Sequence, residues 1–133
     1  MNASTSYAPT VGRWLLAAIF LISGVGKLFD PAGTIGYISS IGLPLPDLTY
    51  VLAVILEIGG AVLLIAGYQT RIAAVALAVF TLAAALLFHG NVGDQNQFIH
   101  LLKNVAIAGG LLQVAAFGAG RLSVDGRRAA AVA

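Results

Sequence analysis

The sequence predicts an all-α membrane protein whose four transmembrane helices form an up-down-up-down bundle. Composition is the first observation behind this prediction, because 59% of the 133 residues are apolar and only 9% are charged, against about 25% charged in a soluble domain. The second is that apolar residues gather in four long segments, and the third is that turn-forming residues separate these segments. Seven basic and five acidic side chains are too few to solvate a domain of this size. Most of the surface must therefore face lipid.

The four apolar segments have the length of membrane-spanning helices. The hydrocarbon core of a bilayer is about 30 Å thick and a helix rises about 1.5 Å per residue, so the second and fourth segments cross it and the other two nearly do. The segments are residues 14–29, 48–68, 72–89 and 98–117. Together they predict one transmembrane domain, residues 13–118, between an N-terminal tail, residues 1–12, and a C-terminal tail, residues 119–133.

The connections between these helices differ in length. Residues 30–47 contain many helix breakers, which end one helix and delay the next, so we expect at most a short interfacial turn at residues 35–41. The turn at Gln69 and Thr70 is so tight that the helices on either side must be antiparallel neighbours. Residues 90–97 form a polar loop. The breakers in the first connection are Pro31, Gly33, Gly42, Pro44 and Pro46.

The N-terminal region has some features of a secretory signal. Arg13 precedes an uncharged apolar run that ends in small residues at Gly24 and Gly26. The residues before this run are almost uncharged, however, and the helix contains polar side chains. We therefore expect it to be retained as a membrane span.

The basic residues predict how the chain is oriented, because cytoplasmic loops are enriched in Lys and Arg. With four spans, both termini and the turn at residues 69–71 lie on one side of the membrane. That side carries the arginines, and the other side carries only Lys27 and Lys103. We therefore expect both termini in the cytoplasm. The arginines concerned are Arg13, Arg71, Arg121, Arg127 and Arg128.

Nearly all polar side chains within the predicted helices fall in the half away from the termini. Their spacing places them on inward-facing helix stripes. Gly24 and Gly60 lie beside the charged positions, where small residues let helices approach closely. We expect an outward-facing polar pocket lined by Lys27, Glu57, His89, His100, Lys103 and Asn104.

Glu57 is the most informative of these residues. It lies about 13 Å of helix from the nearer end, so it must be protonated, paired or in a hydrated cavity. Lys27 and Lys103 are the candidate partners. Arg13 and Lys27 are separated by only about 21 Å of helix, and we expect Arg13 to snorkel towards water.

Two interpretations of Glu57 stay open. In the first, Glu57 and one lysine form a buried ion pair that only fixes helix packing. In the second, Glu57 is a catalytic proton acceptor or donor, Lys27 or Lys103 polarises a carbonyl, and His89, His100 and Asn104 contact the ligand. Two lysines against one glutamate leave a positive charge, which suits an anionic or carbonyl-bearing ligand such as a quinone.

Several other chemistries are excluded or disfavoured. The chain has no cysteine, which excludes disulfides, thiolate catalysis and iron–sulfur clusters. His89 and His100 do not match a metal-ligand spacing, so we expect no metal. No basic patch is present for nucleic acid, and no serine is placed for a Ser-His-Asp arrangement. Any redox role must therefore use electrons from a cofactor.

The order and spacing of several short motifs resemble the DoxX family of small bacterial membrane proteins over about residues 11–118. The motifs are Arg13, Ser23-Gly-Val-Gly-Lys27-Leu28, Gly42-Leu-Pro44, Glu57-Ile-Gly59-Gly60, Gly67-Tyr-Gln-Thr-Arg71, Lys103-Asn104 and Gly109-Gly110. The resemblance implies a multi-pass protein of the bacterial cytoplasmic (inner) membrane, and it singles out Lys27, Glu57, Arg71, Lys103 and Asn104 as recurring polar positions. Members of the family are associated with quinone-linked oxidation of sulfur compounds, redox-stress complexes and stress from quinones or aromatic compounds.

We therefore expect a protein that binds a quinone-like hydrophobic molecule in a membrane redox system, as a quinone-linked oxidoreductase or a subunit of one. A non-catalytic membrane subunit or scaffold is the alternative. A small-solute permease is disfavoured, because the half of the bundle nearer the termini has almost no interior polar group beyond Thr81. Besides lipid, the expected partners are a redox protein or a second copy, packed on a stripe formed by Ala74, Ala78 and Ala85.

Overall fold

The computed structural model describes residues 3–133, and these residues form helices joined by turns. Four of the helices contain apolar stretches long enough to span a membrane, at Tyr7–Phe29, Pro46–Ala66, Thr70–Phe88 and Gln95–Phe117. The prediction of an all-α protein with four candidate spans is therefore confirmed. The helices are α1 (Ala3–Phe29), α2 (Pro31–Ser40), α3 (Pro46–Ala66), α4 (Thr70–Phe88), α5 (Gln95–Phe117) and α6 (Val124–Ala131).

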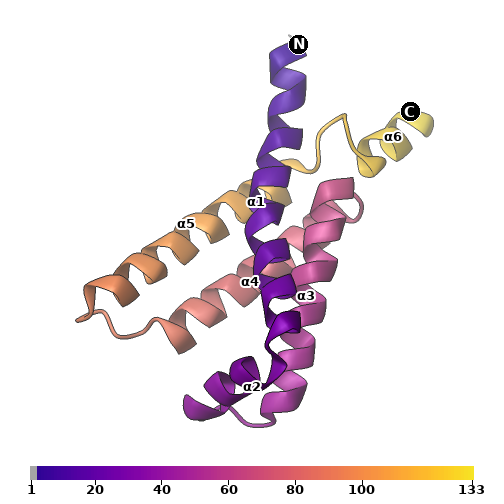
Figure 1. Cartoon of the computed structure of the whole chain (residues 1–133). Helices are drawn as coiled ribbons and strands as arrows, with labels where there is room; N and C mark the ends of the chain where they lie inside the picture. Colours follow the sequence, from indigo (N-terminus) through magenta and orange to yellow (C-terminus); the bar gives the residue numbers. More distant parts are fainter. Residues whose placement is uncertain (1–2) are drawn as a thin grey trace.

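The spans pack as two antiparallel pairs and not as a regular four-helix bundle. Contacts between helices are concentrated within the pair α1 and α3 and within the pair α4 and α5. Figure 1 shows the second pair leaving the first at a steep angle, so that the pairs meet near the chain termini and diverge at the other end. We call these the termini end and the cavity end. The short helix α2 lies at the cavity end and packs on α3.

The core lies where the two pairs meet. It is made of Ala17, Phe20, Ala61, Leu64, Ala74, Leu77, Ala78 and Leu111. Small residues allow the approach, since a Cβ atom on Gly60 would lie 2.8 Å from Leu77 Cγ, closer than side chains can pack. The alanine stripe that we expected to face a second copy is buried in this core or beside it, so that basis for a homo-oligomer is wrong.

Some helices begin at other residues than predicted, because local capping residues and not apolar composition determine where these helices start. Helix α1 begins 11 residues before the predicted residue 14, and Pro9 lies within it. Helix α2 replaces the short turn expected at residues 35–41, because Asp30 accepts a hydrogen bond from Gly33 N–H at 3.0 Å and Pro31 occupies the first turn. The predicted N-terminal tail thus falls within α1, apart from residues 1 and 2, which lie outside the described residues.

Residues 119–126, part of the predicted C-terminal tail, pack across the ends of the spans, and we call them the terminal clasp. Asp125 N–H donates to Gly67 O at 2.9 Å, at the end of α3. The carboxylate of Asp125 accepts hydrogen bonds from Gln69 N–H at 3.0 Å and Thr70 N–H at 2.9 Å, at the start of α4. Gly67 has φ 69°, and a Cβ there would lie 2.4 Å from Ser123 Cβ, so only glycine fits this turn.

Arg13 joins the clasp to the helices. Its guanidinium donates to Ala119 O at 2.9 Å, to Ile65 O at 3.2 Å and to Leu122 O at 2.8 Å, and also to Leu64 O. The side chain is only 1% exposed. The expectation that Arg13 snorkels to water is therefore wrong, because carbonyls at the end of α3 and in the clasp supply acceptors in the interior.

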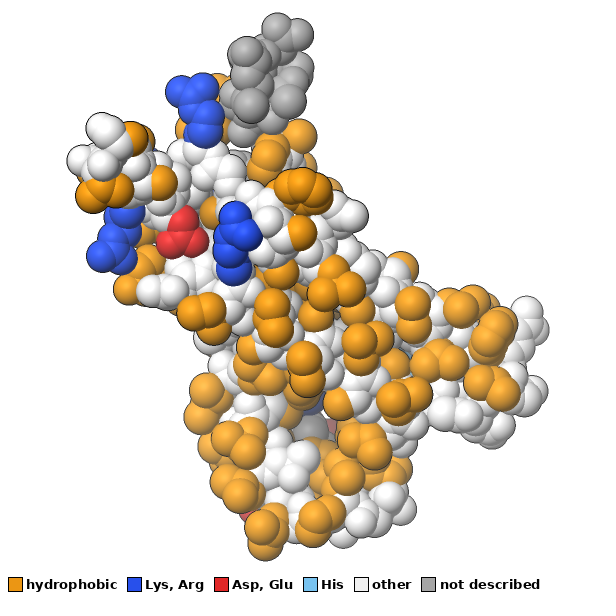
Figure 2. All heavy atoms as spheres, turned by 180° about the vertical axis from the view of Figure 1, so that it is seen from behind, with side chains coloured by type: hydrophobic (Ala, Val, Ile, Leu, Met, Phe, Trp, Pro, Cys, Tyr) orange, Lys and Arg blue, Asp and Glu red, His pale blue; other side chains and the backbone are white. Residues whose placement is uncertain are grey.

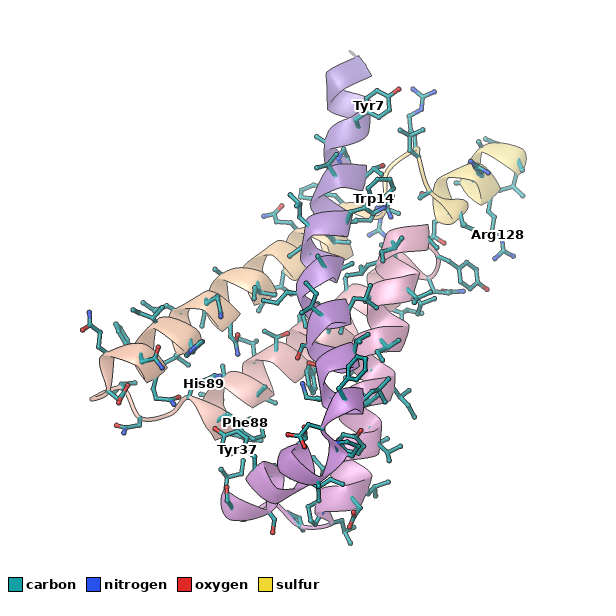
Figure 3. All side chains as sticks on the ribbon, viewed as in Figure 1. Tyr7, Trp14, Tyr37, Phe88, His89 and Arg128 are labelled. Carbon is teal, nitrogen blue, oxygen red and sulfur yellow. The ribbon has the colours of Figure 1, made fainter. Side chains whose placement is uncertain are left out.

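The surface has the character expected of a membrane protein. Figure 2 shows hydrophobic side chains over most of one face, with most of the visible Lys, Arg, Asp and Glu gathered at the termini end. Trp14 Nε1–H donates to Ile65 O at 3.1 Å, and the guanidinium of Arg128 lies 5.6 Å from the ring centroid of Tyr68. In Figure 3, Tyr7, Trp14 and Arg128 mark this end, as aromatic and basic residues do at a membrane interface.

Candidate functional site

A cavity of about 580 Å³ lies between the two helix pairs at the cavity end. Its size is within the range of small-molecule sites, about 300–1,000 Å³. Helices α1 to α5 all contribute to its lining, which is mainly apolar with a few polar groups. The six polar residues that we expected in one pocket all line it: Lys27, Glu57, His89, His100, Lys103 and Asn104.

An ion pair forms the polar centre of the side made by α1 and α3. Lys27 Nζ lies 2.8 Å from Glu57 Oε2 and donates to Ser23 Oγ at 2.8 Å, and Ser23 Oγ donates to Glu57 Oε1 at 2.9 Å. Lys27 and Ser23 are one helical turn apart, so both reach the same carboxylate. The partner of Glu57 is therefore Lys27, and Lys103 lies on the α5 side.

The two members of the pair differ in exposure. The side chain of Glu57 is 5% exposed and that of Lys27 is 25% exposed, so Lys27 is the more accessible to a ligand. Gly24 makes the close packing possible, because a Cβ atom there would lie 2.6 Å from Ile58 Cγ1 and 3.2 Å from Glu57 Cβ. Glu57 can reach a ligand proton most readily through Ser23 or Lys27.

The α5 side of the cavity carries hydrogen-bond donors. His100, Lys103 and Asn104 share one face of α5, since they are three and four residues apart. The rings of His100 and His89 stack with centroids 5.0 Å apart, and His89 Nδ1 lies 2.7 Å from Gln97 Oε1. Within residues 3–133, no group of three or more His, Cys, Asp or Glu side chains could hold a metal ion.

Aromatic rings and one threonine complete the lining. Tyr37 of α2 and Phe88 of α4 approach to 5.3 Å between centroids, next to His89 in Figure 3, and so connect α2 to α4 across the cavity end. Thr81 is 4% exposed, and its hydroxyl has no hydrogen-bond partner in the described part of the chain. Phe20 and Phe80 add apolar surface. These groups provide both stacking surface and a spare hydrogen-bonding group.

The sequence did not single out Tyr37 or Ser23 as site residues. Tyr37 fell in a segment interpreted as a loop, although the Asp30-Pro31 pair is a helix-start signal that could have placed it on a helix. Ser23 was named only as the first residue of the motif at residues 23–28. Its bridging role depends on how α1 is rotated against α3, which spacing along one helix does not determine.

The other two predicted positions, Arg13 and Arg71, lie at the termini end. Arg71 donates to Ala115 O at 3.2 Å and Ala116 O at 2.7 Å, which satisfies carbonyls at the end of α5. Between this end and the cavity lie buried apolar residues such as Ala61, Leu64 and Leu111. The cavity therefore ends at an apolar floor.

Comparison with known proteins gives consistent matches to membrane proteins. The family model DoxX matches residues 8–90. Inner membrane protein YqjF of Escherichia coli (strain K12) is 36% identical over 115 residues, which cover 86% of this chain and 87% of YqjF. Inner membrane protein YphA of the same organism is 36% identical over 123 residues, 88% of this chain and 87% of YphA.

A third relative comes from another bacterium. The Bacillus subtilis (strain 168) protein named "Putative oxidoreductase CatD" is 33% identical over 114 residues, which cover 81% of this chain and 82% of CatD. No solved structure gives a significant match to this chain.

Proposed function

Because this chain belongs to the DoxX family and is a multi-pass protein of the bacterial inner membrane, we propose that it binds a quinone-like hydrophobic molecule as part of a membrane redox system. The single observation that carries the proposal is the cavity of about 580 Å³, which is lined by both an ion pair and aromatic rings. The name of CatD, a relative described as an oxidoreductase, supports the redox part of the proposal.

The residues present fit a quinone. Apolar and aromatic side chains such as Phe20, Phe80 and Phe88 can hold a planar ring. The ammonium of Lys27 can donate to a carbonyl oxygen while Glu57 keeps that ammonium oriented. When bound, a quinone supplies the electron-accepting chemistry that the side chains of this chain lack, and a partner redox protein supplies the electrons.

Proton exchange is the second role that we assign to the ion pair. Glu57 is the acceptor or donor, and Ser23 and Lys27 link it to the cavity through hydrogen bonds of 2.8 to 2.9 Å. Lys103 polarises a carbonyl or binds an oxygen from the α5 side, with His89, His100 and Asn104 as further ligand contacts. In this proposal the cavity opens towards the periplasm and both termini lie in the cytoplasm, in agreement with the arginine distribution.

The competing proposal is a scaffold in which the Lys27 and Glu57 pair only sets helix packing. It is favoured by the local pairing of Glu57, since Lys27 Nζ lies 2.8 Å from its Oε2 and Ser23 donates a hydrogen bond to its Oε1. Both proposals expect Glu57→Gln to be tolerated better than Glu57→Ala, because truncation leaves a lysine unpaired at a cost of about 3 to 5 kcal/mol.

The double variant Lys27→Met with Glu57→Leu separates the two proposals. It removes both charges and keeps the volume, so we expect stability to return towards that of the wild type. Quinone retained by the purified protein, measured by mass spectrometry of extracted lipids, should stay at background if the cavity is a binding site. Recovery of stability, ligand retention and growth complementation together would refute the site and leave the scaffold role.

A further inference from the structure

The two sides of the cavity differ in charge balance. On the side of α1 and α3, Lys27 is offset by Glu57 at 2.8 Å. On the α5 side, Lys103 lines the same cavity without a carboxylate within 4.0 Å among residues 3–133. Its neighbours His100 and Asn104 also carry donor groups. One side of the cavity is thus charge-neutral and the other carries an unbalanced cation.

The nearby carboxylates do not restore the balance. Asp30 lines the cavity mouth, but it is exposed and accepts a hydrogen bond from Gly33 N–H at 3.0 Å. Asp94 is also exposed and accepts from Gln97 N–H at 3.0 Å, at the start of α5. Each of these groups is committed to a helix N-terminus.

We infer that the α5 side binds the ionised oxygen of an aromatic anion, so that acidic hydroxyquinones and aromatic carboxylates are preferred over neutral quinones. Lys103 pairs with the ionised oxygen, His100 and Asn104 donate to the same group, and the ring lies against Phe80 and Ile107. The quinone part of this inference rests on the proposed function, and the preference for negative charge goes beyond it.

The physical basis is the strength of a charge-assisted hydrogen bond in an apolar cavity. Such bonds are shorter and about twice as strong as neutral ones, and Lys103, which is exposed and lines the cavity, is accessible to form one with a ligand anion. A neutral carbonyl at the same place would leave the ammonium of Lys103 without a counterion. Charge on the ligand is therefore the variable that the experiment should change.

The test uses purified protein in detergent, with binding measured by calorimetry. The probes are lawsone, a hydroxynaphthoquinone that is an anion at neutral pH, its neutral methyl ether, and naphthoate, an aromatic anion without quinone carbonyls. We expect the wild type to bind lawsone about tenfold more tightly than the ether, as for a hydrogen bond to a charged group. Lys103→Gln should weaken lawsone binding about tenfold and change ether binding less than about twofold.

Two further variants test whether the positive charge at position 103, and not the net charge of the protein, causes the preference for lawsone. Lys103→Arg keeps the positive charge and should keep the preference for lawsone. Arg121→Gln makes the same change in net charge on an exposed residue of the terminal clasp, and it should leave lawsone binding unchanged. Lys103 is exposed, so its replacement should not alter the packing of α5, and thermal unfolding of each variant checks this.

The remaining outcomes distinguish this inference from the proposed function. Equal binding of lawsone and its ether would overturn the inference and leave the proposed function standing. Lys103-dependent binding of naphthoate alone would support the anion site and overturn the quinone function. Lys103-dependent binding of phosphatidylglycerol without any aromatic probe would show a lipid-headgroup site and overturn the inference. Binding of no probe by the wild type would overturn both.

Discussion

Arg13 connects parts of the chain that lie far apart in sequence. Its guanidinium bonds to carbonyls at the end of α3 and in the terminal clasp, 51 to 109 residues away in sequence. A planar guanidinium with five donors can serve several acceptors at once, which a lysine ammonium on a flexible stem does less well. The residue therefore stabilises the termini end in a way that no other type can replace.

Replacing Arg13 should destabilise the protein strongly. Each buried carbonyl left without a donor costs about 1 to 3 kcal/mol, so Arg13→Met should lower the free energy of unfolding by about 3 kcal/mol or more, and Arg13→Lys by less. Arg71→Met is the matched control, because the carbonyls that it leaves are exposed and water can replace the arginine. Thermal unfolding in detergent measures both, and equal losses would contradict the assigned role.

Single residues were predictable from the sequence to different degrees. A glutamate deep in an apolar helix must have a polar environment, and this argument placed Glu57 in the right surroundings. It could not decide between Lys27 and Lys103, because the rotation of each helix about its axis is set by packing. It was wrong for Arg13, since acceptors so distant in sequence are invisible until the chain has folded.

At the scale of helices, adjacent glycines in α3 have different roles. A Cβ on Gly60 would meet Leu77 at 2.8 Å, whereas nothing lies within 4 Å of one on Gly59. Gly60→Ala should therefore destabilise by about 1 to 3 kcal/mol through overpacking. Gly59→Ala should be neutral or stabilise by up to about 1 kcal/mol, because alanine favours the helix. Unfolding midpoints of the pair test this, and similar effects would disprove close packing at Gly60.

Asp125 makes the joint between α3 and α4 sensitive to acid. Burial favours a higher pKa for this carboxyl, but hydrogen bonds from Thr70 and Gln69 and the charge of Arg128 outweigh burial and hold the pKa below its ordinary value. A group with a lowered pKa stabilises the fold above its unfolded pKa, and this contribution is lost as the pH falls through the folded value.

Because the pKa of Asp125 is lowered, replacing this residue should cost more stability at neutral pH than in acid. Asp125→Ala should cost about 1 kcal/mol at neutral pH, as for other N-caps, and the difference from the wild type should shrink below about pH 4. Unfolding midpoints recorded from neutral to acidic pH give this difference directly. A difference that is constant with pH would mean that the charge of Asp125 does not matter to the joint.

The sequence predicted the long helices well, because their apolar composition marks their extent. It predicted the short helices less well, because their starts depend on individual capping residues. The apolar parts of α3, α4 and α5 match the predicted segments to within a few residues. Helices α2 and α6 were missed because they are short, and their starts depend on Asp30 and Ser123, whose side chains accept hydrogen bonds from Gly33 and Gly126. Composition over a long window cannot detect such local signals.

For the whole molecule, orientation in the membrane is the most direct prediction. A reporter that is active only in the cytoplasm should be active when fused after Ala133, and one that is active only after export should work when inserted at residues 91–96. The reason is that Arg13, Arg71 and the arginines after residue 120 lie on the termini side. Reversed activities would place the cavity on the cytoplasmic face.

The sequence predicted only part of the overall arrangement of the helices. Four spans and the gathering of polar residues in one half could be predicted, because both depend on position along each helix. The divergence of the two helix pairs could not be predicted, since it depends on which residues meet between helices, such as Gly60 of α3 against Leu77 of α4. The cavity exists because of this divergence, so its presence required the three-dimensional structure.

The long-range bonds of Arg13 also have a consequence for biosynthesis. Arg13 and Leu122 are 109 residues apart, and ribosomes add about 5 to 20 residues per second, so the arginine is made roughly 5 to 20 s before its last acceptor. During that interval all four candidate spans are made, and the acceptors already present for the guanidinium are Thr10 Oγ1 and the carbonyls of Leu64 and Ile65. A nascent chain that stops after Phe117 contains every span but lacks the bonds from Arg13 to Ala119 and Leu122. The segment that follows α5 therefore completes the set of hydrogen bonds that Arg13 of α1 makes.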